Sequence, residues 1–219
     1  CIRDSYITDY HGDLLEAIVD NMASLDNLSK QQILQERRLL AESGVISYAS
    51  LLPVIEKLTQ ESSYLVVSAV SSILQGLSLF VDEGSEVEEA YKALLVTFNQ
   101  FNFERLGFEP KAGEADEDEM VRQLVIANMI KGDDVKASAK ASEIFAAHAD
   151  NISKLPAAIR LQILINQIKH HESKELTDLY LTTYAQATDG NFKRQLSTAL
   201  AYTTCLLYTS DAADDTPCV

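Results

Sequence analysis

ESSYLVVSAVSSILQGLSLF, residues 61–80, carries the clearest helical pattern of the chain. Its apolar side chains recur three or four residues apart, a spacing that places them on one face of an α-helix. The positions with this spacing are Val66, Ala69, Val70, Ile73, Leu77 and Phe80. Leu65, Val67 and Leu74 widen the apolar stripe, so we expect this helix to be buried against more than one neighbour.

The segment before residues 61–80 shows the same periodicity. A helix is predicted from Ser29 to just before Gly44, because glycine commonly adopts the left-handed conformation that ends a helix. The next helix begins near Ser47 or Ser50. We prefer Ser50, since Pro53 then falls in the first turn, where its missing N–H costs no hydrogen bond.

The segment after residue 80 continues the helical pattern. Ser85 and Glu88 form a capping-box motif that opens a helix to about Phe103. Residues 106–115 hold two glycines and a proline, so we interpret them as a loop and a candidate hinge. Further helices are predicted over residues 12–22, 116–131, 133–149, 156–169, 173–187 and 189–204.

This succession of about ten helices with short connections predicts an all-α fold. We favour a HEAT- or armadillo-like α-solenoid of antiparallel helix pairs over an irregular bundle, because short loops favour stacking of nearest neighbours. No strand pattern competes after residue 10. Candidate repeat starts near residues 29, 61, 116 and 156 are unevenly spaced and share no consensus.

The composition limits the classes of function. The chain has 219 residues, 47% of them hydrophobic, and a formal net charge of −15, which disfavours nucleic acids and anionic membranes as partners. It contains no apolar run of the roughly 20 residues that span a membrane. Its cysteines, Cys1, Cys205 and Cys218, form no disulfide or zinc framework, which indicates a reducing, cytoplasmic location.

Both ends of the chain differ from the middle. We interpret residues 1–10 as the end of a preceding segment, and residues 11–204 as one incomplete helical domain. Residues 205–219, CLLYTSDAADDTPCV, continue no helical period and resemble the translation of a sequencing-library adapter. We therefore expect a non-native tail there and leave it out of functional reasoning.

The chain contains no recognisable catalytic motif. HExxH, GxSxG, GxxxxGK[ST] and GxGxxG are all absent. His170 and His171 are adjacent, so on a helix they point about 100° apart and do not converge on one metal. His11 and His148 stand alone. The acidic run 116–119 is better explained as a helix start than as a cation site. We thus assign no catalytic or metal-ligating residue.

Several polar residues interrupt apolar helix faces, namely Arg37, Arg122, Asn128 and Arg160. We expect Arg37 and Arg122 to form buried ion pairs, for which the local carboxylates are Glu36, Glu42 and Glu119. The alternative is that one arginine faces a groove and binds a peptide carboxylate through two hydrogen bonds. Half-buried packing is expected for the tyrosines, which are Tyr48, Tyr64, Tyr91, Tyr180 and Tyr184.

Residues 106–130, LGFEPKAGEADEDEMVRQLVIANMI, resemble the helical C-terminal domain of the aminopeptidase N family, lactic-acid-bacterial and streptococcal type. Upstream, the order from Ser29-Lys30 through Gln35-Glu36 to Leu40-Ala41 and Gly44 is similar to the family pattern, with Lys30 and Glu36 as conservative replacements. Glu61 and Tyr64 also match, whereas Val67 stands where the family usually has Trp. The resemblance covers roughly residues 5–204 and includes no catalytic motif.

The resemblance implies a zinc exopeptidase that removes N-terminal residues from peptides. The zinc ligands and the loop that binds the substrate amine belong to an upstream catalytic domain, so zinc is implied for the parent enzyme and not for this chain. The helical domain of the family covers the active site and encloses the peptide cavity. Which residues of this chain contact peptide stays unassigned.

Two functions from different classes follow. The first is a partial helical domain of a cytoplasmic zinc aminopeptidase, inactive alone, whose partners are the upstream catalytic domain of the same polypeptide and peptide substrates. The alternative is a stand-alone helical-repeat scaffold that binds a protein or peptide on its concave face. An enzyme with a site of its own would need residues that the sequence does not offer.

Overall fold

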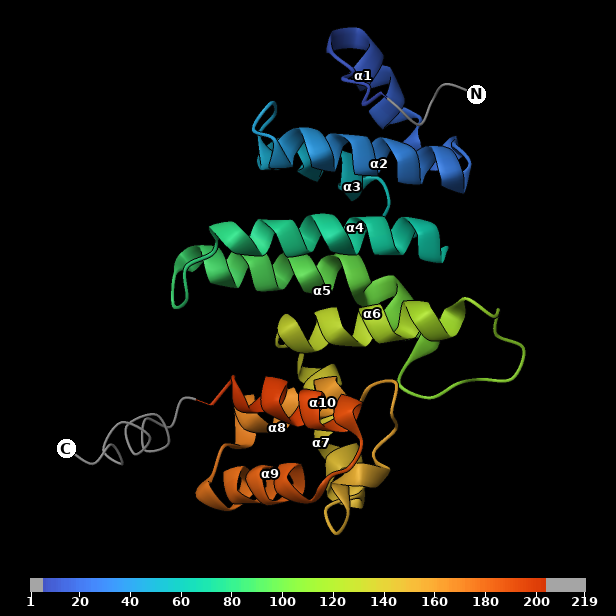
Figure 1. The fold of residues 1–219 in the computed structure, drawn as a ribbon. Helices are drawn as coiled ribbons and strands as arrows, with labels where there is room; N and C mark the ends of the chain where they lie inside the picture. Colours follow the sequence, from blue (N-terminus) through green and yellow to red (C-terminus); the bar gives the residue numbers. More distant parts are fainter. Residues whose placement is uncertain (1–5, 204–219) are drawn as a thin grey trace, which may run out of the picture. The chain divides into compact units, whose positions relative to one another are not determined.

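The computed structural model describes residues 6–203, which form ten α-helices, several short 3-10 turns and no strand (Figure 1). The predictions of an all-α fold and of about ten helices are confirmed; the solenoid arrangement stays a prediction. None of the helices in this range is long and apolar enough to cross a membrane. The tail inferred for residues 205–219 lies outside the described residues.

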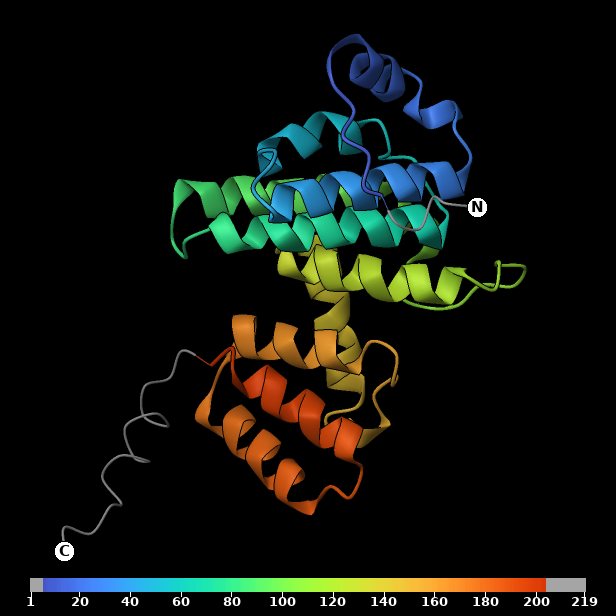
Figure 2. The same ribbon diagram turned by 45° about the horizontal axis from the view of Figure 1, so that its top comes forward.

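The chain divides into two compact units at Ala137 and Ser138. The α-helices that lie in the first unit are α1 (Gly12–Asp20), α2 (Asn27–Glu42), α3 (Leu52–Glu56), α4 (Tyr64–Leu77), α5 (Glu86–Leu106) and α6 (Asp118–Lys131). Helix α2 packs on α4, and both α4 and α5 pack on α6. Helices α4 and α5 lie side by side in both views (Figures 1 and 2).

The second unit is built on α7 (Val135–Ala147), which begins just before the boundary and lies mostly beyond it. It continues with α8 (Arg160–His171), α9 (Lys174–Gln186) and α10 (Gly190–Leu200). Helix α10 packs against α8 and α9, as Figure 2 shows. The fully buried side chains of this unit include Ile163, Leu164, Tyr180, Leu196 and Ala199.

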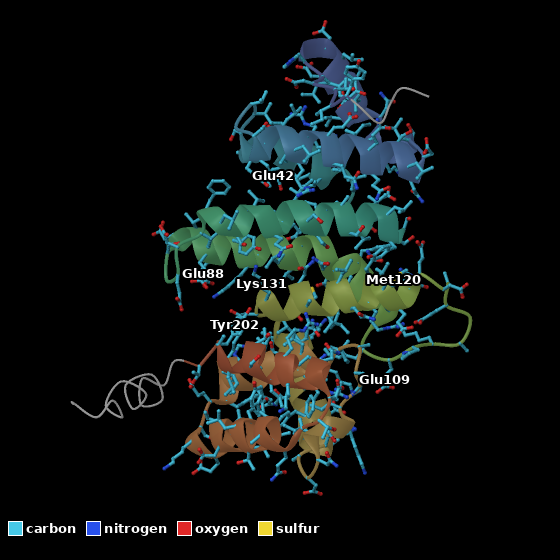
Figure 3. The ribbon with its side chains drawn as sticks, viewed as in Figure 1. Glu42, Glu88, Glu109, Met120, Lys131 and Tyr202 are labelled. Atoms are coloured by element: carbon cyan, nitrogen blue, oxygen red, sulfur yellow. The ribbon has the colours of Figure 1, made fainter. Side chains whose placement is uncertain are left out.

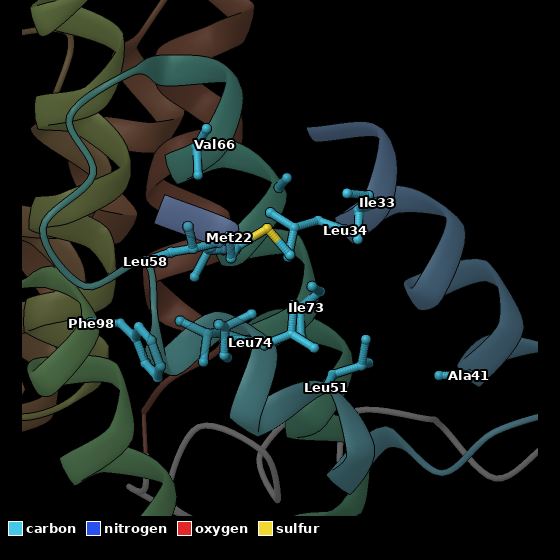
Figure 4. Close-up of a cluster of buried hydrophobic side chains, with 14 of the residues drawn as sticks. Met22, Ile33, Leu34, Ala41, Leu51, Leu58, Val66, Ile73, Leu74 and Phe98 are labelled. Atoms are coloured by element: carbon cyan, nitrogen blue, oxygen red, sulfur yellow. The ribbon is translucent and has the colours of Figure 1, made fainter. Parts of the chain in front are cut away.

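The core of the first unit confirms the expected apolar stripe over residues 66–74, whereas Phe80 lies beyond the end of α4 and is 64% exposed. Val66, Ile73 and Leu74 of α4 are fully buried and belong to one hydrophobic cluster (Figure 4). The same cluster includes Leu34 of α2 and Phe98 of α5. Helix α4 thus meets more than one neighbour, as its wide stripe predicts.

Most helix ends follow the caps expected from the sequence, with shifts that have local causes. Helix α2 starts two residues before the predicted Ser29, because the Asp26 carboxylate accepts hydrogen bonds from the N–H groups of Leu28 and Ser29. Gly44, with a φ of 75°, follows its end as predicted. Helix α8 begins at Arg160 and not at Pro156, because residues 156–159 form a turn closed by Ile159 N–H and Pro156 C=O.

Tyr48 explains the glycine inside α4. A Cβ atom added to Gly76 would lie 2.4 Å from the Tyr48 hydroxyl oxygen, so only glycine leaves room for this ring. The Tyr48 ring also contacts that of Phe80, with 5.4 Å between the centroids. Tyr48 belongs to the 3-10 turn Tyr48–Leu51, whose N-terminus is capped by the Ser47 side chain. The 3-10 turn therefore starts at Tyr48, earlier than the preferred Ser50, and α3 follows at Leu52 with Pro53 in its first turn, as predicted.

Candidate functional site

A cluster of ion pairs surrounds the loop between α5 and α6, which the sequence marked as a candidate hinge. Arg105 at the end of α5 lies 2.6 Å from the Asp118 carboxylate at the start of α6. Arg122, which is 3% exposed, pairs with Glu114 of the loop. The Lys111 ammonium donates to the Arg105 carbonyl oxygen at 2.6 Å. The loop is therefore tied to α5 and α6 near both of its ends.

The charges of this cluster shift the titration of its acids. The hydrogen bond from Arg122 is the main cause that lowers the pKa of Glu114. Burial alone would raise the pKa of Asp118, but hydrogen bonds from Arg105 and from the Ala115 N–H outweigh it, so this pKa is also lowered. Both carboxylates are held in their charged form. Each is therefore a weaker base than an ordinary Asp or Glu side chain.

The buried ion pair of Arg122 was predicted, but its partner was not. Glu119 is exposed on α6, whereas Glu114 from the preceding loop reaches Arg122. Glu42 pairs with Arg38. The local carboxylates proposed as partners from the sequence were thus wrong for Arg122, because a loop that folds back brings a carboxylate closer than the helix itself does.

The acidic run 116–119 caps a helix, but not the helix that it begins. The N–H of Tyr64, at the start of α4, donates to Glu117 at 3.1 Å. Asp118 pairs with Arg105, and no side chain in the run caps the first turn of α6. The predicted helix start is confirmed, because α6 begins at Asp118 and carries Asp118 and Glu119 in its first turn, but Glu117 caps α4 and not α6. Figure 3 shows Glu109 on the loop before α6 and Met120 in its first turn.

A second buried ion pair, which the sequence did not predict, lies beside this cluster. The Lys30 ammonium of α2 is 2.6 Å from the Glu61 carboxylate, and the Lys30 side chain is 5% exposed. The Glu61 carbonyl oxygen accepts a hydrogen bond from the Asn102 amide at 2.7 Å. Lys30 precedes the buried Ile33 and Leu34 by three and four residues, so it lies on the same face of the helix. This spacing is the signal from which the burial of Lys30 could have been predicted.

Arg37 has two buried donor atoms without a partner among residues 6–203, more than Arg122, of which only Nε lacks one. Arg37 is 2% exposed, and its Nε and Nη1 atoms have no hydrogen-bond partner among the described residues. Burial lowers the pKa of Arg37, and the nearby Asp9 carboxylate opposes this shift. The ion pair expected with Glu36 is absent, since the Glu36 carboxylate instead accepts a hydrogen bond from Gln32 at 2.9 Å.

Arg160 lines a groove of about 610 Å³ in the second unit. Its Nε and Nη2 atoms donate to the Leu155 carbonyl oxygen at 3.2 and 3.0 Å. Nη2 also donates to the Ser153 carbonyl oxygen at 2.9 Å, and the guanidinium carbon lies 4.8 Å from the centre of the Phe192 ring. These contacts favour the structural interpretation of Arg160 over capture of a peptide carboxylate.

The remaining polar residues singled out from the sequence have structural contacts. The Asn128 amide donates to the Ser71 hydroxyl at 3.2 Å. His11 contacts Asp9, His148 contacts the Ile144 carbonyl oxygen, and His171 contacts the Ser142 hydroxyl. Within residues 6–203, no three His, Cys, Asp or Glu side chains gather as metal ligands would. The described part of the chain therefore does not bring these residues together as one reactive site.

Tyrosines Tyr91 and Tyr180 are more buried than expected. The Tyr91 hydroxyl donates to the Leu74 carbonyl oxygen at 3.0 Å, and the Tyr180 hydroxyl to that of Leu164 at 3.1 Å. Tyr184 is half-exposed, with the Lys193 ammonium 5.2 Å from its ring centre. All three contacts are of the packing kind.

These elements define a helical domain of two compact units, with ion pairs buried in its first unit. Residues 5–205 match the family of the ERAP1-like C-terminal domain, and the chain belongs to this family. The resemblance inferred from residues 106–130 is thereby confirmed.

The relatives of the chain are aminopeptidases. An aminopeptidase N of Lactococcus lactis subsp. lactis is 50% identical over 198 residues, which are 90% of this chain and 23% of the relative. Aminopeptidase N of Lactobacillus delbrueckii subsp. lactis is 35% identical over 89% of the chain and 23% of the relative. A puromycin-sensitive aminopeptidase of Caenorhabditis elegans is 24% identical over 90% of the chain. The chain thus spans about a quarter of the length of these proteins.

Proposed function

We propose that this chain is the helical domain of a cytoplasmic zinc aminopeptidase that removes N-terminal residues from peptides. Its role is to cover the active site and to shape the cavity that holds the peptide, without taking part in the chemistry. The identity of 50% to an aminopeptidase N over 90% of the chain carries this proposal. The catalytic domain of the same polypeptide and the peptide substrate are its partners.

The donor groups of the described residues do not fit zinc. A catalytic zinc site needs three converging His, Asp, Glu or Cys ligands, and residues 6–203 contain no such group. His171, at the end of α8, contacts a serine hydroxyl. We therefore assign zinc to the remainder of the parent enzyme. The residues of this chain supply a scaffold, in which the Arg105–Asp118 and Arg122–Glu114 pairs fix the loop before α6.

The proposal is tested with a chimera. Residues 6–203 replace the matching segment of the Lactococcus lactis aminopeptidase N, and hydrolysis of leucyl-p-nitroanilide is measured for the chimera, the unchanged relative and the 219-residue chain alone. We expect the chimera to hydrolyse the reporter and the chain alone to be inactive. Size-exclusion chromatography and circular dichroism control for folding of the chimera.

A second measurement on the same proteins addresses the cavity. If this domain shapes the peptide cavity, the chimera and the relative will differ in their preference for peptides of different length, while their rates on the single-residue reporter stay similar. A folded but inactive chimera, or a chain that cleaves the reporter alone, would refute the proposal. The first of these outcomes would favour the stand-alone binding scaffold.

A further inference from the structure

A cleft in the first unit ends on a buried carboxylate. The cleft encloses about 330 Å³ and is lined by the segment before α1, by α1 and by the first half of α2. Tyr6 and Tyr10 contribute aromatic rings, and Ile18 and Ile33 contribute apolar side chains. Glu36 is the acidic residue of the lining and is 7% exposed.

The Glu36 carboxylate is only half satisfied. Its Oε1 atom accepts a hydrogen bond from the Gln32 amide, whereas Oε2 is buried and has no partner among residues 6–203. The neighbouring Arg37 forms no ion pair with it. A buried carboxylate oxygen without a donor is costly, and this cost is removed when a cation or another donor enters the cleft.

The described side chains that line the cleft include no cation, which favours one from outside. Residues 6–37 contain six Asp and Glu side chains and two cations, Lys30 and Arg37. Arg37, whose Nε and Nη1 atoms lack partners, is not among the residues that line the cleft. Lys30 is buried in its ion pair with Glu61. The tyrosine rings at the mouth of the cleft are suited to a guanidinium or ammonium group, since a cation is attracted to the face of an aromatic ring.

We propose that the cleft binds an arginine or lysine side chain from the part of the parent aminopeptidase that lies outside this chain. This inference rests on the proposed function. The chain spans 23% of the length of its lactococcal relative, so most of the parent polypeptide is available to supply the side chain. The ammonium or guanidinium group donates to the Glu36 carboxylate, and the aliphatic stem lies against Ile18 and Ile33.

The first experiment tests the chemistry of the cleft on the 219-residue chain. N-acetylarginine amide is titrated into the 15N-labelled protein, with N-acetylcitrulline amide as a neutral probe of the same shape. We expect the arginine probe to shift the backbone amide signals of residues 6–10 and 32–36. In Glu36→Gln we expect its binding to weaken about tenfold, because a charge-assisted hydrogen bond is lost.

Glu56→Gln is the matched control, since Glu56 is exposed and lies on α3 of the same unit. It removes the same charge and should leave the binding of the arginine probe unchanged. Glu36→Gln should keep the circular dichroism and the amide spectrum of the folded chain, because it removes an unpaired buried charge. Equal responses to the two probes, including no response to either, would overturn the proposal. So would equal weakening in both variants.

The second experiment identifies the source of the cation. Hydrogen exchange of residues 6–10 and 29–36 is compared between the chain alone and the aminopeptidase chimera. We expect slower exchange in the chimera, and loss of this protection with Glu36→Gln but not with Glu56→Gln. Equal exchange in chain and chimera would overturn the assignment. A concentration-dependent dimer of the chain that Glu36→Gln abolishes would assign the cleft to a second copy instead.

The two proposals can fail separately. The probe titration involves no peptide substrate and no catalytic domain, so a negative result leaves the aminopeptidase proposal standing. An inactive chimera would contradict the aminopeptidase proposal and the assignment to its polypeptide, while the selectivity of the cleft for a cation would still stand on the titration.

Discussion

The pair of helices α4 and α5 in the first unit and the pair α8 and α9 in the second unit share two kinds of hydrogen bond, although their connecting segments differ in length. In each pair a serine caps the second helix: Ser85 accepts from the Glu88 N–H, and Ser173 accepts from the Leu176 N–H. About two turns later, the hydroxyl of Tyr91 or Tyr180 donates to a backbone carbonyl of the first helix. The two units thus share a way of fixing a helix pair.

The surroundings of the two tyrosines differ. The Lys131 ammonium lies 5.2 Å from the centre of the Tyr91 ring. The first unit, to which both residues belong, also contains buried ion pairs. Tyr180 is fully buried, with the Phe145 ring 6.4 Å away, and burial raises the pKa of its hydroxyl well above the usual range. The comparison shows that the same hydrogen bond, from a tyrosine hydroxyl to a backbone carbonyl of the neighbouring helix, occurs beside a charged group in the first unit and in an apolar environment in the second.

The largest effect that separates the two units is expected from Arg122→Ala. Removing one partner of a buried ion pair leaves the other without compensation, and we expect the first unit to lose about 3 kcal/mol of stability. Hydrogen exchange of the α6 amides should accelerate, while that of α8 should not change. Arg194→Ala, at an exposed position of α10, is the control and should change neither. Equal acceleration of hydrogen exchange in α6 and α8 would contradict the expectation that this ion pair stabilises the first unit alone.

A smaller effect is expected when each tyrosine hydroxyl is removed. Tyr180→Phe leaves the buried Leu164 carbonyl without this donor and should cost about 1.5 kcal/mol. Tyr91→Phe should cost about 1 kcal/mol, since Tyr91 is 8% exposed and water can reach its surroundings more easily. Urea unfolding followed by hydrogen exchange of each unit measures both values. A larger cost for Tyr91→Phe would contradict this order.

The smallest effect is expected from mild acid. Glu114 and Asp118 of the first unit have lowered pKa values, so their stabilisation is complete above their unfolded pKa, near 4, and is lost as the pH falls through the folded pKa. Between pH 5 and pH 3 the amide signals of α6 should therefore weaken before those of α8. Loss of both sets at the same pH would show that these carboxylates do not distinguish the units.

The helices could be predicted from the sequence because their information is local. The apolar spacing of residues 66–74, the capping serine of α5 and Gly44 each act within a few residues, and each was predicted correctly, whereas the stripe was wrong at Phe80, which is exposed. The partner of Arg122 was not predictable in this way, because Glu114 reaches it only when the loop folds back.

The candidate site was less accessible to sequence reasoning than the fold. Glu36 was noted as a possible partner of Arg37, but its unpaired oxygen depends on where α1 and the preceding segment lie. The Lys30–Glu61 pair joins α2 to the segment before α4, and the apolar spacing around Lys30 does not indicate which residue is its partner. The family was predictable because its short motifs and their order along the chain can be read directly from the sequence.

The hydrogen bond between Tyr64 and Glu117 sets an order of events during synthesis. The Tyr64 N–H at the start of α4 donates to the carboxylate of Glu117, which lies 53 positions further along the chain. A ribosome makes about 5–20 residues per second, so the first turn of α4 leaves the exit tunnel several seconds before Glu117 does. This hydrogen bond at the start of α4 thus forms only after the beginning of the sixth helix has emerged.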